Sequence, residues 1–176
     1  VVDLVSGVVL GPGAEGEGQV RAASTMAGYL PEEATAAAFD HGWYRTGDVG
    51  WLGEDGWVHL TDRAKEMMKV NGFQVAPAEI EAVLHGHPDV ADCAVFGVPD
   101  ERAGEVPSAA VTLAEGAHVS EQELHALVAR DLEMAGYKRL RSVVVVDAIP
   151  RLASGKVLRR VLRDEIVPSL VAAGEA

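Results

Sequence analysis

The chain has 176 residues and is 48% hydrophobic, enough for one domain with a sizeable core or for two small ones. Its net charge of −12 argues against a role on nucleic acid or membrane surfaces, and no apolar run approaches the roughly 20 residues of a membrane span. The single Cys93 excludes an internal disulfide and predicts a cytoplasmic location, with this residue a small buried hydrophobe of a strand. Because it opens with Val1 rather than methionine, we expect a piece of a longer protein.

The first third of the chain is predicted to be rich in short strands. Glycines and prolines punctuate residues 1–30 as turns, and the acidic residues after Pro31 predict a helix that runs to Phe39. Two β-prone runs, residues 44–52 and 56–61, flank the Asp55-Gly56 pair. That pair between such runs is typical of a β-hairpin.

A second hairpin and a helix are predicted next. Residues 67–70 and 73–75 flank Asn71-Gly72, the preferred pair of a type I′ turn. A helix is predicted from Pro77, with Gly86 as its end. Its buried face is expected to carry Ile80, Val83 and Leu84.

Strands and helices are mixed in the rest of the chain. Buried strands are predicted at residues 93–98 and 108–113, and another strand is predicted at 142–146. Ser120 and Glu123 form a capping box that begins a helix extending to about Met134. A last helix is expected to begin near Gly155 and to direct four side chains inward: Leu158, Val161, Leu162 and Ile166.

These elements predict an α+β fold. The chain contains no internal repeat and no strict strand–helix–strand alternation, which argues against a doubly wound sheet. Residues 1–62 are dominated by strands, whereas residues 63–176 mix strands and helices. The sequence therefore predicts a domain boundary between Asp62 and Arg63.

Basic residues are concentrated near the C-terminus. Eight of the fifteen lie between Lys138 and Arg163, and only Asp147 opposes them, so this segment carries eight positive charges against one negative. On an acidic chain, such a segment predicts a patch for a small anionic ligand. A solvated helix face is the alternative.

Three short segments carry residues suited to chemistry. Residues 44–48 place Asp48 after a glycine turn, where a carboxylate can accept hydrogen bonds from the vicinal diol of a ribose. The alternative is an ordinary turn without a binding role, because Thr-Gly-Asp is also a common turn sequence. Residues 62–81 hold Lys65 and Lys69, whose four-residue spacing puts both on one face of a strand. Protection of an edge strand by lysine is the alternative there.

The third segment is residues 150–160, in which Lys156 follows the Ser154-Gly155 turn just before a helix. We interpret this turn as flexible, so that the ammonium can reach phosphate or carboxylate oxygens. It is not a P-loop, because the leading glycine of that motif is absent and no Ser or Thr follows the lysine.

Together, in this order and spacing, the three segments resemble the adenylate-forming superfamily of acyl-CoA and aryl-CoA ligases, luciferases and peptide-synthetase adenylation domains. The wording of residues 73–81, FQVAPAEIE, is most similar to the branch of 4-coumarate-CoA ligases, luciferases and fatty-acyl-CoA ligases. The resemblance implies that residues 1–62 end a large N-terminal domain, with short β-barrel-like strands and one helix. Residues 63–176 would then form its small mobile C-terminal α+β domain.

The implied activity is a two-step ligation. A carboxylic acid and ATP give an acyl adenylate and pyrophosphate, and coenzyme A (CoA) then gives the thioester and AMP. A non-catalytic nucleotide- or CoA-binding module is one alternative. An adenylation domain with another acceptor, as in luciferases or carrier-protein systems, is the other.

The resemblance also implies roles for individual residues. Asp48 would bind the ribose hydroxyls of ATP with help from Arg63, and Gln74 would face the nucleotide. Lys156 would bridge the substrate carboxylate and ATP during adenylation, and Lys69 would act in thioester formation. The remaining assignments are Lys65 as the hinge between the domains, and Gly72 and Phe73 along the pantetheine arm of CoA.

The implied cofactors are ATP, Mg²⁺ and CoA, with Mg²⁺ held mainly by a preceding part of the protein. That part would also contain the phosphate loop and the acyl pocket, so we expect the 176-residue chain to be inactive by itself. Val70-Asn71 departs from the Tyr-Lys of many relatives and puts a contact to a CoA phosphate in doubt. We expect no metal site, since His85 and His87 follow a helix end without a third ligand.

Regulation is implied as well. Residues 150–156 resemble the site at which bacterial protein acetyltransferases silence acyl-CoA ligases, so an acetyltransferase and a deacetylase acting on Lys156 are expected partners. Acetylation would remove the positive charge that the adenylation step needs.

Overall fold

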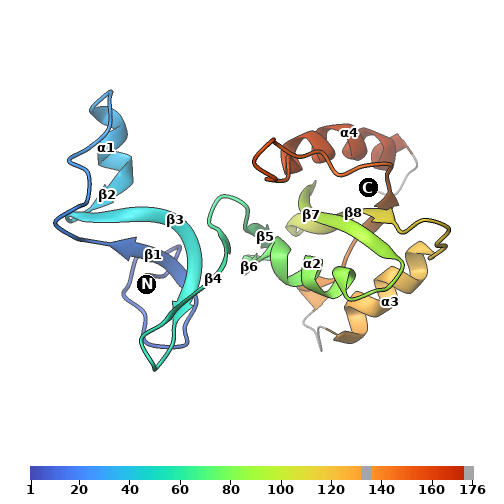
Figure 1. Cartoon of the computed structure of the whole chain (residues 1–176), viewed down its shortest axis with the longest axis horizontal. Coiled ribbons are helices and arrows are strands. Elements are labelled where there is room, and N and C mark those ends of the chain that lie inside the picture. Colours follow the sequence, from blue (N-terminus) through green and yellow to red (C-terminus); the bar gives the residue numbers. More distant parts are fainter. Residues whose placement is uncertain (132–135, 173–176) are drawn as a thin grey trace. The chain divides into compact units, whose positions relative to one another are not determined.

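The computed structural model describes residues 1–131 and 136–172. The chain divides into two compact units, Val1–Lys65 and Glu66–Ala176 (Figure 1). This division falls three residues after the boundary predicted at Asp62, because the last strand of the first unit continues to Arg63. Among the described residues, no helix is long and apolar enough to cross a membrane.

The first unit is a four-stranded antiparallel sheet with one short helix. Its strands are β1 (Gly16–Val20), β2 (Phe39–Asp40), β3 (Trp43–Leu52) and β4 (Val58–Arg63), and the helix α1 spans Glu33–Ala38. The long strand β3 pairs with all three of the others. Within residues 1–65, which the structure describes throughout, the sheet is open and does not close into a barrel.

Both elements predicted for the C-terminal part of the first unit are confirmed. The helix expected from Pro31 is α1, which begins two residues later than expected. The two runs around Asp55-Gly56 are β3 and β4, with Leu52 opposite Val58. Gly56 has a φ of +83°, and the Gly53 N–H donates to the Trp57 carbonyl over 2.8 Å, so the turn is a three-residue loop closed by a left-handed glycine.

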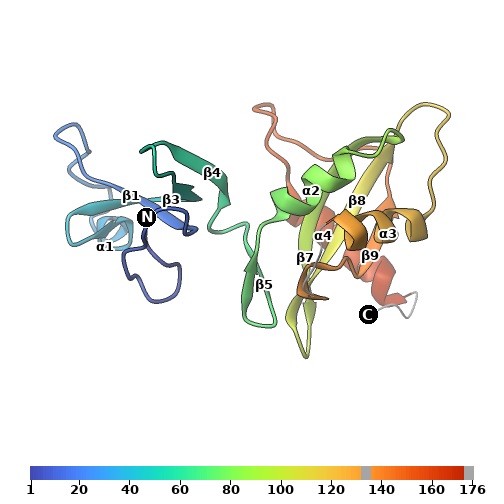
Figure 2. The same ribbon diagram turned by 90° about the horizontal axis from the view of Figure 1, so that it is seen from below.

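The second unit is a mixed sheet covered by helices on both faces. The strand order is β6-β5-β8-β7, and β9 pairs in parallel with β8. Figure 2 shows α2 and α3 on one face of the sheet and α4 on the other. The strands are β5 (Met68–Val70), β6 (Phe73–Val75), β7 (Val90–Asp100), β8 (Gly104–Leu113) and β9 (Ser142–Val145). The helices are α2 (Pro77–His85), α3 (Glu121–Asp131), a 3₁₀ turn at Gly136–Lys138, and α4 (Arg159–Ala172).

The core of the second unit consists of two hydrophobic clusters, one on each side of β7. Cys93 and Val95 face the cluster that α2 and α3 cover, whereas Ala94 and Phe96 face the cluster under α4. A β-bulge leaves Ala91 without an opposite residue on β8. Because a bulge shifts the alternation by one residue, Val90 also faces the first cluster.

Local sequence signals in this unit are largely confirmed. Asn71 and Gly72 have φ values of +51° and +84°, as the type I′ turn requires. The capping box forms, with the Ser120 N–H donating to Glu123 over 2.8 Å and the Glu123 N–H donating to Ser120 Oγ over 3.2 Å. The expected extension of this helix to Met134 lies outside the described residues.

The start of the last helix was predicted too early. The helix begins at Arg159 rather than near Gly155, because residues 150–158 form a hairpin whose hydrogen bonds fix a non-helical backbone. Leu162 and Ile166 are buried as expected. Leu158, which precedes the helix, and Val161 are only half-buried.

Candidate functional site

Asp48 and Arg63 are brought together in the first unit. They lie opposite each other on β3 and β4, and Arg63 Nε is 2.8 Å from Asp48 Oδ1. Arg63 also donates from Nη1 to the Thr46 carbonyl over 3.2 Å. The arginine therefore orients a carboxylate that is about one-third exposed, with 32% of its side-chain surface accessible. Such an oriented carboxylate suits hydrogen bonds from a diol.

A buried carboxylate that the sequence analysis missed shapes the turn before Asp48. Glu17 is 3% exposed, and its Oε2 accepts from Arg45 Nε and Nη2 over 2.9 and 2.7 Å. Its other oxygen accepts from the Gly47 N–H over 3.2 Å, and Gly47 has a φ of +69°. The hydrogen bonds to Glu17, together with its charge, raise the pKa of Arg45 above its ordinary value. Glu17 therefore fixes the left-handed turn from which Asp48 emerges.

Lys69 and Gln74 face each other across the β5–β6 hairpin. They are directly opposite in register, and both are exposed while Met68, Val70 and Val75 are buried. The Lys69 N–H donates to Glu105 Oε2 over 2.7 Å, which ties the hairpin to β8. The hairpin therefore presents an ammonium and an amide on one outer face.

Lys65 does not share that face. It was expected on a strand four residues before Lys69, but it lies in a turn before β5 and is the last residue of the first unit. The alternation rule failed because it assumed an unbroken strand from Lys65 to Lys69, and β5 begins only at Met68.

Gly72 and Phe73 form the tip of the β5–β6 hairpin. A side chain added at Gly72 would meet no atom within 4 Å, so space alone does not require glycine there, whereas its positive φ does. Phe73 is 54% exposed and stacks on Tyr137, with ring centroids 4.4 Å apart and an interplanar angle of 8°. The tip of the hairpin therefore presents an exposed aromatic ring beside a turn with open space around it.

Lys156 lies on a tight hairpin rather than on a flexible turn. The Leu152 N–H donates to the Lys156 carbonyl over 2.9 Å, the Gly155 N–H donates to the Leu152 carbonyl over 2.8 Å, and Gly155 has a φ of +84°. This is again a three-residue loop closed by a left-handed glycine. Lys156 Nζ lies 3.3 Å from Glu66 Oε1, and the lysine side chain is 44% exposed. The ammonium is therefore accessible but already faces an anion.

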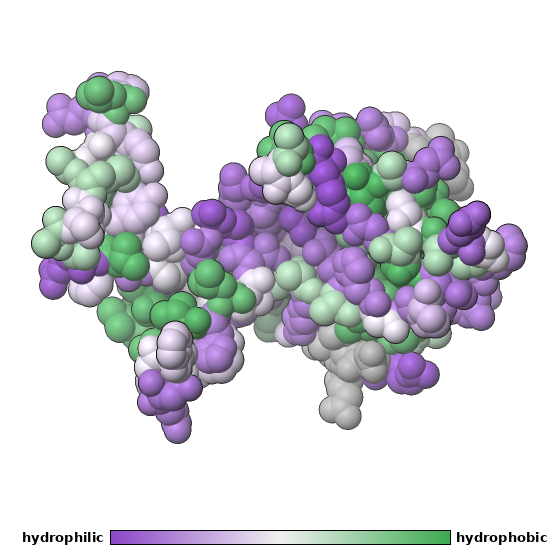
Figure 3. Space-filling model, viewed as in Figure 1, coloured by the Kyte–Doolittle hydropathy of each residue, from purple (hydrophilic) through white to green (hydrophobic). Residues whose placement is uncertain are grey.

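The basic C-terminal segment is not an unopposed patch. Arg159 contacts Glu66 at 3.8 Å and Glu81 at 2.7 Å, and its Nε donates to the Val95 carbonyl over 2.9 Å. Glu81 in turn accepts from the Val95 N–H over 2.8 Å, so the two side chains occupy the outer edge of β7 as a neighbouring strand would. In Figure 3, hydrophilic side chains gather between α2 and the loop before α4. The charge count along the sequence could not reveal these pairs, because their acidic members are distant in the chain.

The histidines near the end of α2 have local partners. His85 Nδ1 is 2.9 Å from the Glu81 carbonyl and 3.2 Å from Cys93 Sγ, and His85 Nε2 is 3.4 Å from Asp92 Oδ1. Burial, followed by the nearby charges of Glu81 and Asp92, raises the pKa of Cys93 to about 12. A thiol with that pKa is a weak nucleophile at neutral pH, so this cluster does not resemble a catalytic triad.

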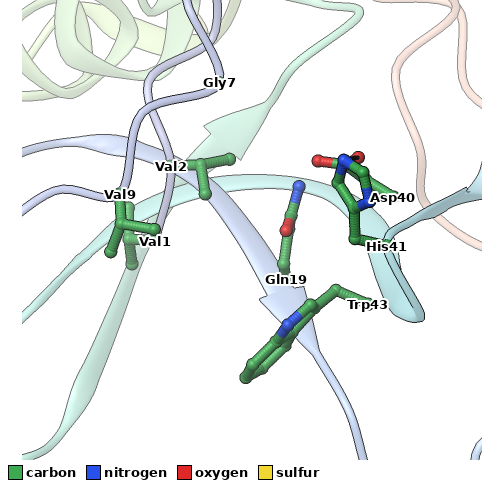
Figure 4. A pocket seen from close by; sticks show the side chains of 8 residues that line it. All are labelled: Val1, Val2, Gly7, Val9, Gln19, Asp40, His41 and Trp43. Atoms are coloured by element: carbon green, nitrogen blue, oxygen red, sulfur yellow. Dashed lines mark ion pairs between the residues drawn. The ribbon is translucent and has the colours of Figure 1, made fainter.

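One hollow in the first unit lies outside the three motifs. It has a volume of about 340 Å³, and Figure 4 shows its lining side chains, among them Gln19, Asp40, His41 and Trp43. His41 is 95% exposed and approaches Asp40 only to 3.7 Å. The hollow is a shallow surface feature without a buried polar group aimed into it.

The two lysine-bearing hairpins of the second unit point in different directions. Figure 2 shows the β5–β6 hairpin extending from one end of this unit and the loop of residues 150–158 extending from the opposite end. Lys69 and Lys156 therefore lie on two different hairpins of one compact unit. Asp48 and Arg63 belong to the first unit, so the predicted site residues form three groups rather than one.

Comparison with known proteins adds family information. Residues 79–156 match the family model of the AMP-binding enzyme C-terminal domain. The chain is 52% identical over 168 residues to 4-coumarate--CoA ligase-like 9 of Oryza sativa subsp. japonica, a match that covers 94% of this chain and 30% of the rice protein. The chain thus spans about three-tenths of the length of such curated relatives.

Solved structures agree with the sequence relatives. ATP-bound MatB from Rhodopseudomonas palustris matches with a TM-score of 0.84 and 34% identity, over 94% of this chain and 33% of that one. The amide bond synthetase McbA from Marinactinospora thermotolerans matches with a TM-score of 0.83 and 41% identity, over 93% and 34%.

Proposed function

The chain belongs to the adenylate-forming enzymes, carrying their AMP-binding C-terminal domain, and we propose that it is part of an ATP-dependent acid–thiol ligase. The reaction joins a carboxylic acid to coenzyme A by way of an acyl adenylate. The observation that carries this proposal is the placement of Lys156 and Lys69 on two different hairpins of one compact unit. Two half-reactions that share one site need two such surfaces.

Lys156 is proposed to act in the first half-reaction. Attack of a carboxylate on the α-phosphate of ATP brings two anions together, and an ammonium that contacts both lowers the barrier by electrostatics and positioning. In the structure this ammonium faces Glu66 at 3.3 Å, so it is already oriented toward a carboxylate oxygen. The Lys156 side chain is 44% exposed and Glu66 is 17% exposed, and Glu66 keeps Arg159 as a second partner at 3.8 Å, so the lysine can exchange Glu66 for a substrate anion at small cost.

Lys69, with Gln74 opposite it, is proposed to serve the other surface. Gly72 and Phe73 at the tip of the same hairpin are proposed to lie along the pantetheine arm of CoA, since the tip is open and presents an apolar ring. Lys69 would then assist thioester formation. The expected contact of Gln74 with the nucleotide during adenylation stays a prediction, and the two-surface arrangement does not explain it, because Gln74 lies opposite Lys69 on the hairpin assigned to thioester formation.

Lys65 is proposed to be the hinge that exchanges the two surfaces. It ends the first compact unit, in a turn between β4 and β5, where a change of backbone angles disturbs neither sheet. A pivot at such a position lets one site host two chemical steps.

Asp48 is proposed to hold the ribose of ATP. Its carboxylate is oriented by Arg63 and by the turn that Glu17 fixes, and a preorganised acceptor of this kind suits two vicinal hydroxyls. The proposed cofactors are ATP, CoA and Mg²⁺. Within residues 1–131 and 136–172 no group of three or more His, Cys, Asp or Glu side chains could hold a metal ion, so we assign no step of this chain's residues to Mg²⁺.

A different acceptor in the second half-reaction is the second candidate. The favouring observation is the 41% identity to a protein described as an amide bond synthetase, although the identity to 4-coumarate--CoA ligase-like 9 is higher at 52%. Supplying the acyl adenylate with CoA in one reaction and with an amine in another would separate the two. Faster turnover of the amine would favour the amide-forming function.

Acetylation of Lys156 is a further part of the proposal, with an acetyltransferase and a deacetylase as partners in a cytoplasmic location. The 44% exposure of the side chain supports access by a modifying enzyme. Arg151 and Arg159 are engaged with Asp92 and Glu81, so they contribute little free positive charge to docking of such an enzyme. Mass spectrometry of protein from its native host would test it, and acetylation at Lys138 beside an unmodified Lys156 would contradict it.

Substitution of the two lysines tests the proposed function. In the full-length protein we expect Lys156→Ala to abolish ATP–pyrophosphate exchange while sparing thioester formation from supplied acyl adenylate. Lys69→Ala should do the opposite, because each side chain belongs to one surface. Equal loss of both half-reactions in both variants would contradict the two-surface mechanism. The 176-residue chain alone should release no AMP with ATP, CoA and a panel of acids.

A further inference from the structure

The hairpin that carries Lys156 is closed at its base as well as at its tip. Arg151 and Val157 form an antiparallel bridge, and the Leu158 N–H donates to the Pro150 carbonyl over 2.9 Å. The loop between them is closed through Gly155, whose φ of +84° disfavours any residue with a Cβ. The backbone of Lys156 therefore has one arrangement, although its side chain has four rotatable bonds.

One guanidinium connects this hairpin to the sheet. Arg151 donates to Asp92 from Nε over 3.2 Å and from Nη2 over 2.8 Å to each carboxylate oxygen. Its third nitrogen, Nη1, donates to the Gly155 carbonyl over 2.9 Å. The Gly155 carbonyl belongs to the peptide group that joins Gly155 to Lys156. Arg151 therefore holds, through β7, the peptide plane from which the Lys156 side chain departs.

Asp92 is itself a fixed anchor. It lies on the same side of β7 as Ala94, and its Oδ1 accepts from the Cys93 N–H over 2.9 Å and lies 3.4 Å from His85 Nε2. Burial opposes ionisation of this carboxyl, but the hydrogen bonds and charge of Arg151 outweigh burial and hold the pKa of Asp92 below its ordinary value. The anchor is therefore an ionised carboxylate at neutral pH.

We propose that Arg151 is a positioning residue for Lys156: by joining Asp92 to the Gly155 carbonyl, it sets the direction from which the lysine ammonium meets the substrate carboxylate and the α-phosphate. This proposal rests on the proposed adenylation function. Fixing the peptide plane leaves only the side-chain torsions to be ordered when substrate binds, which lowers the entropic cost of the reactive geometry. Lysine at position 151 would keep the charge but not the fork that spans both acceptors.

The expected effects of losing Arg151 on rate and on stability differ in size, which distinguishes a positioning role from a contribution to stability. Arg151 and Asp92 are 38% and 30% exposed, and ion pairs that are this accessible add little to stability. A displacement of about 1 Å in a reacting group, by contrast, can reduce a rate by about 100-fold. Loss of the guanidinium should therefore affect the rate of adenylation much more than the melting temperature.

The test uses Arg151→Ala and Arg151→Lys in the full-length protein, with ATP–pyrophosphate exchange and thioester formation measured separately. We expect Arg151→Ala to lower kcat of adenylation by about 10- to 100-fold, with KM for ATP within about threefold. Arg151→Lys should lie between the alanine variant and wild type. Thioester formation from supplied acyl adenylate should stay within about threefold of wild type, because Lys69 is on the other hairpin.

Three further variants make the interpretation specific. Arg163→Ala removes a basic side chain of similar exposure, 41%, from the same segment and should leave both half-reactions unchanged. Gly155→Ala disturbs the same peptide from within the turn and should lower kcat as Arg151→Ala does. The charge exchange Asp92→Arg with Arg151→Asp restores an ion pair but not the donor to Gly155, so it should keep the melting temperature near that of wild type without restoring kcat.

The outcomes distinguish this inference from the proposed function. If Arg151→Ala retains adenylation within about threefold while Lys156→Ala abolishes it, the positioning role is overturned and the function of Lys156 stands. If Arg151→Ala slows both half-reactions equally and lowers the melting temperature, Arg151 is a structural residue only, and the inference is again overturned. If Lys156→Ala itself adenylates normally, the proposed function fails first.

Discussion

Residues 1–65 bury two hydrophobic side chains, Val2 and Val49, whereas the described part of residues 66–172 buries a hydrophobic cluster on each face of its sheet. The first unit exposes hydrophobic side chains on its surface (Figure 3), among them Trp57 at 73% and Leu60 at 69%. Its ordered turn depends on the buried Glu17 and the hydrogen bonds that this carboxylate accepts. In the second unit, hydrophobic packing holds the scaffold, and ion pairs orient the hairpins at its edges.

The comparison shows two ways of placing a functional side chain. Asp48 is oriented by polar contacts within a sheet that buries few hydrophobic side chains. The geometry of Asp48 and the stability of its unit therefore depend on the same few groups. Lys156 projects from a hairpin outside a core that does not need it, so its geometry can change without loss of the fold. We therefore expect substitutions to separate function from stability in the second unit but not in the first.

The largest effect is expected from Leu84→Ala, which truncates a fully buried side chain of α2. We expect the free energy of unfolding of the second unit to fall by ~2–5 kcal/mol, from lost burial and a residual cavity. All three tryptophans, Trp43, Trp51 and Trp57, lie in the first unit, so their fluorescence reports that unit, while far-UV circular dichroism is dominated by the helices of the second. Urea denaturation should therefore shift the dichroism transition and leave the fluorescence transition in place.

The exposed Leu60 provides the control for that experiment. Leu60→Ala should change the free energy of unfolding by less than about 0.5 kcal/mol. If Leu84→Ala shifts both transitions together, the two units unfold as one and the comparison between them does not hold.

A middle-sized effect is expected from Glu17→Gln in the first unit. The amide of glutamine carries no charge to pair with Arg45. We therefore expect the free energy of unfolding of the first unit to fall by ~1–3 kcal/mol, with only the fluorescence transition shifted. Hydrogen exchange at the Gly47 amide, which donates to Glu17, should accelerate in parallel. The exposed Glu15 offers the matched control Glu15→Gln, which should change neither measurement. Unaltered exchange at Gly47 in the Glu17 variant would show that the turn does not depend on this carboxylate.

The smallest effect concerns pH and the second unit. Because the folded-state pKa of Asp92 lies below its ordinary value of 3.8, the unfolded chain binds the proton more readily, and the ionised carboxylate stabilises the fold at neutral pH. Asp92→Asn should cost less than about 1 kcal/mol at pH 7. This difference from wild type should disappear as the pH falls through the lowered pKa. Asp147→Asn, at an exposed position, should show no such trend, and a cost that is independent of pH would rule out the ion pair as its source.

Much of the fold was predictable because its signals are local. The type I′ turn at Asn71-Gly72, the capping box at Ser120 and the helix that begins at Pro77 each depend on neighbouring residues. The α+β class and the adenylate-forming family are likewise confirmed. Tertiary contacts explain what was missed, since Glu17 and Arg45 are 28 residues apart and Glu81 and Arg159 are 78 residues apart.

The candidate site divides in the same way. Asp48 and Arg63 were named from motifs, and the register of β3 and β4 places them opposite each other. The roles assigned to the two lysines remain predictions. Lys156 was interpreted as part of a flexible turn, because Ser-Gly favours turns without revealing whether distant groups fix them. Asp92, 59 residues before Arg151, carries no sequence signal that would identify it as the anchor of the hairpin.

The pairing of Lys156 with Glu66 makes the availability of this lysine a function of ionic strength. Dissolved ions screen exposed charges over about 8 Å at physiological salt, but they act weakly on buried pairs. The Lys156 side chain is 44% exposed, whereas Arg159 and Glu81 are only 16% and 15% exposed. Only salt at about 1 M, where the screening length falls to about 3 Å, should thus loosen the 3.3 Å pair between Lys156 and Glu66, while Arg159 and Glu81 keep the edge of β7 closed.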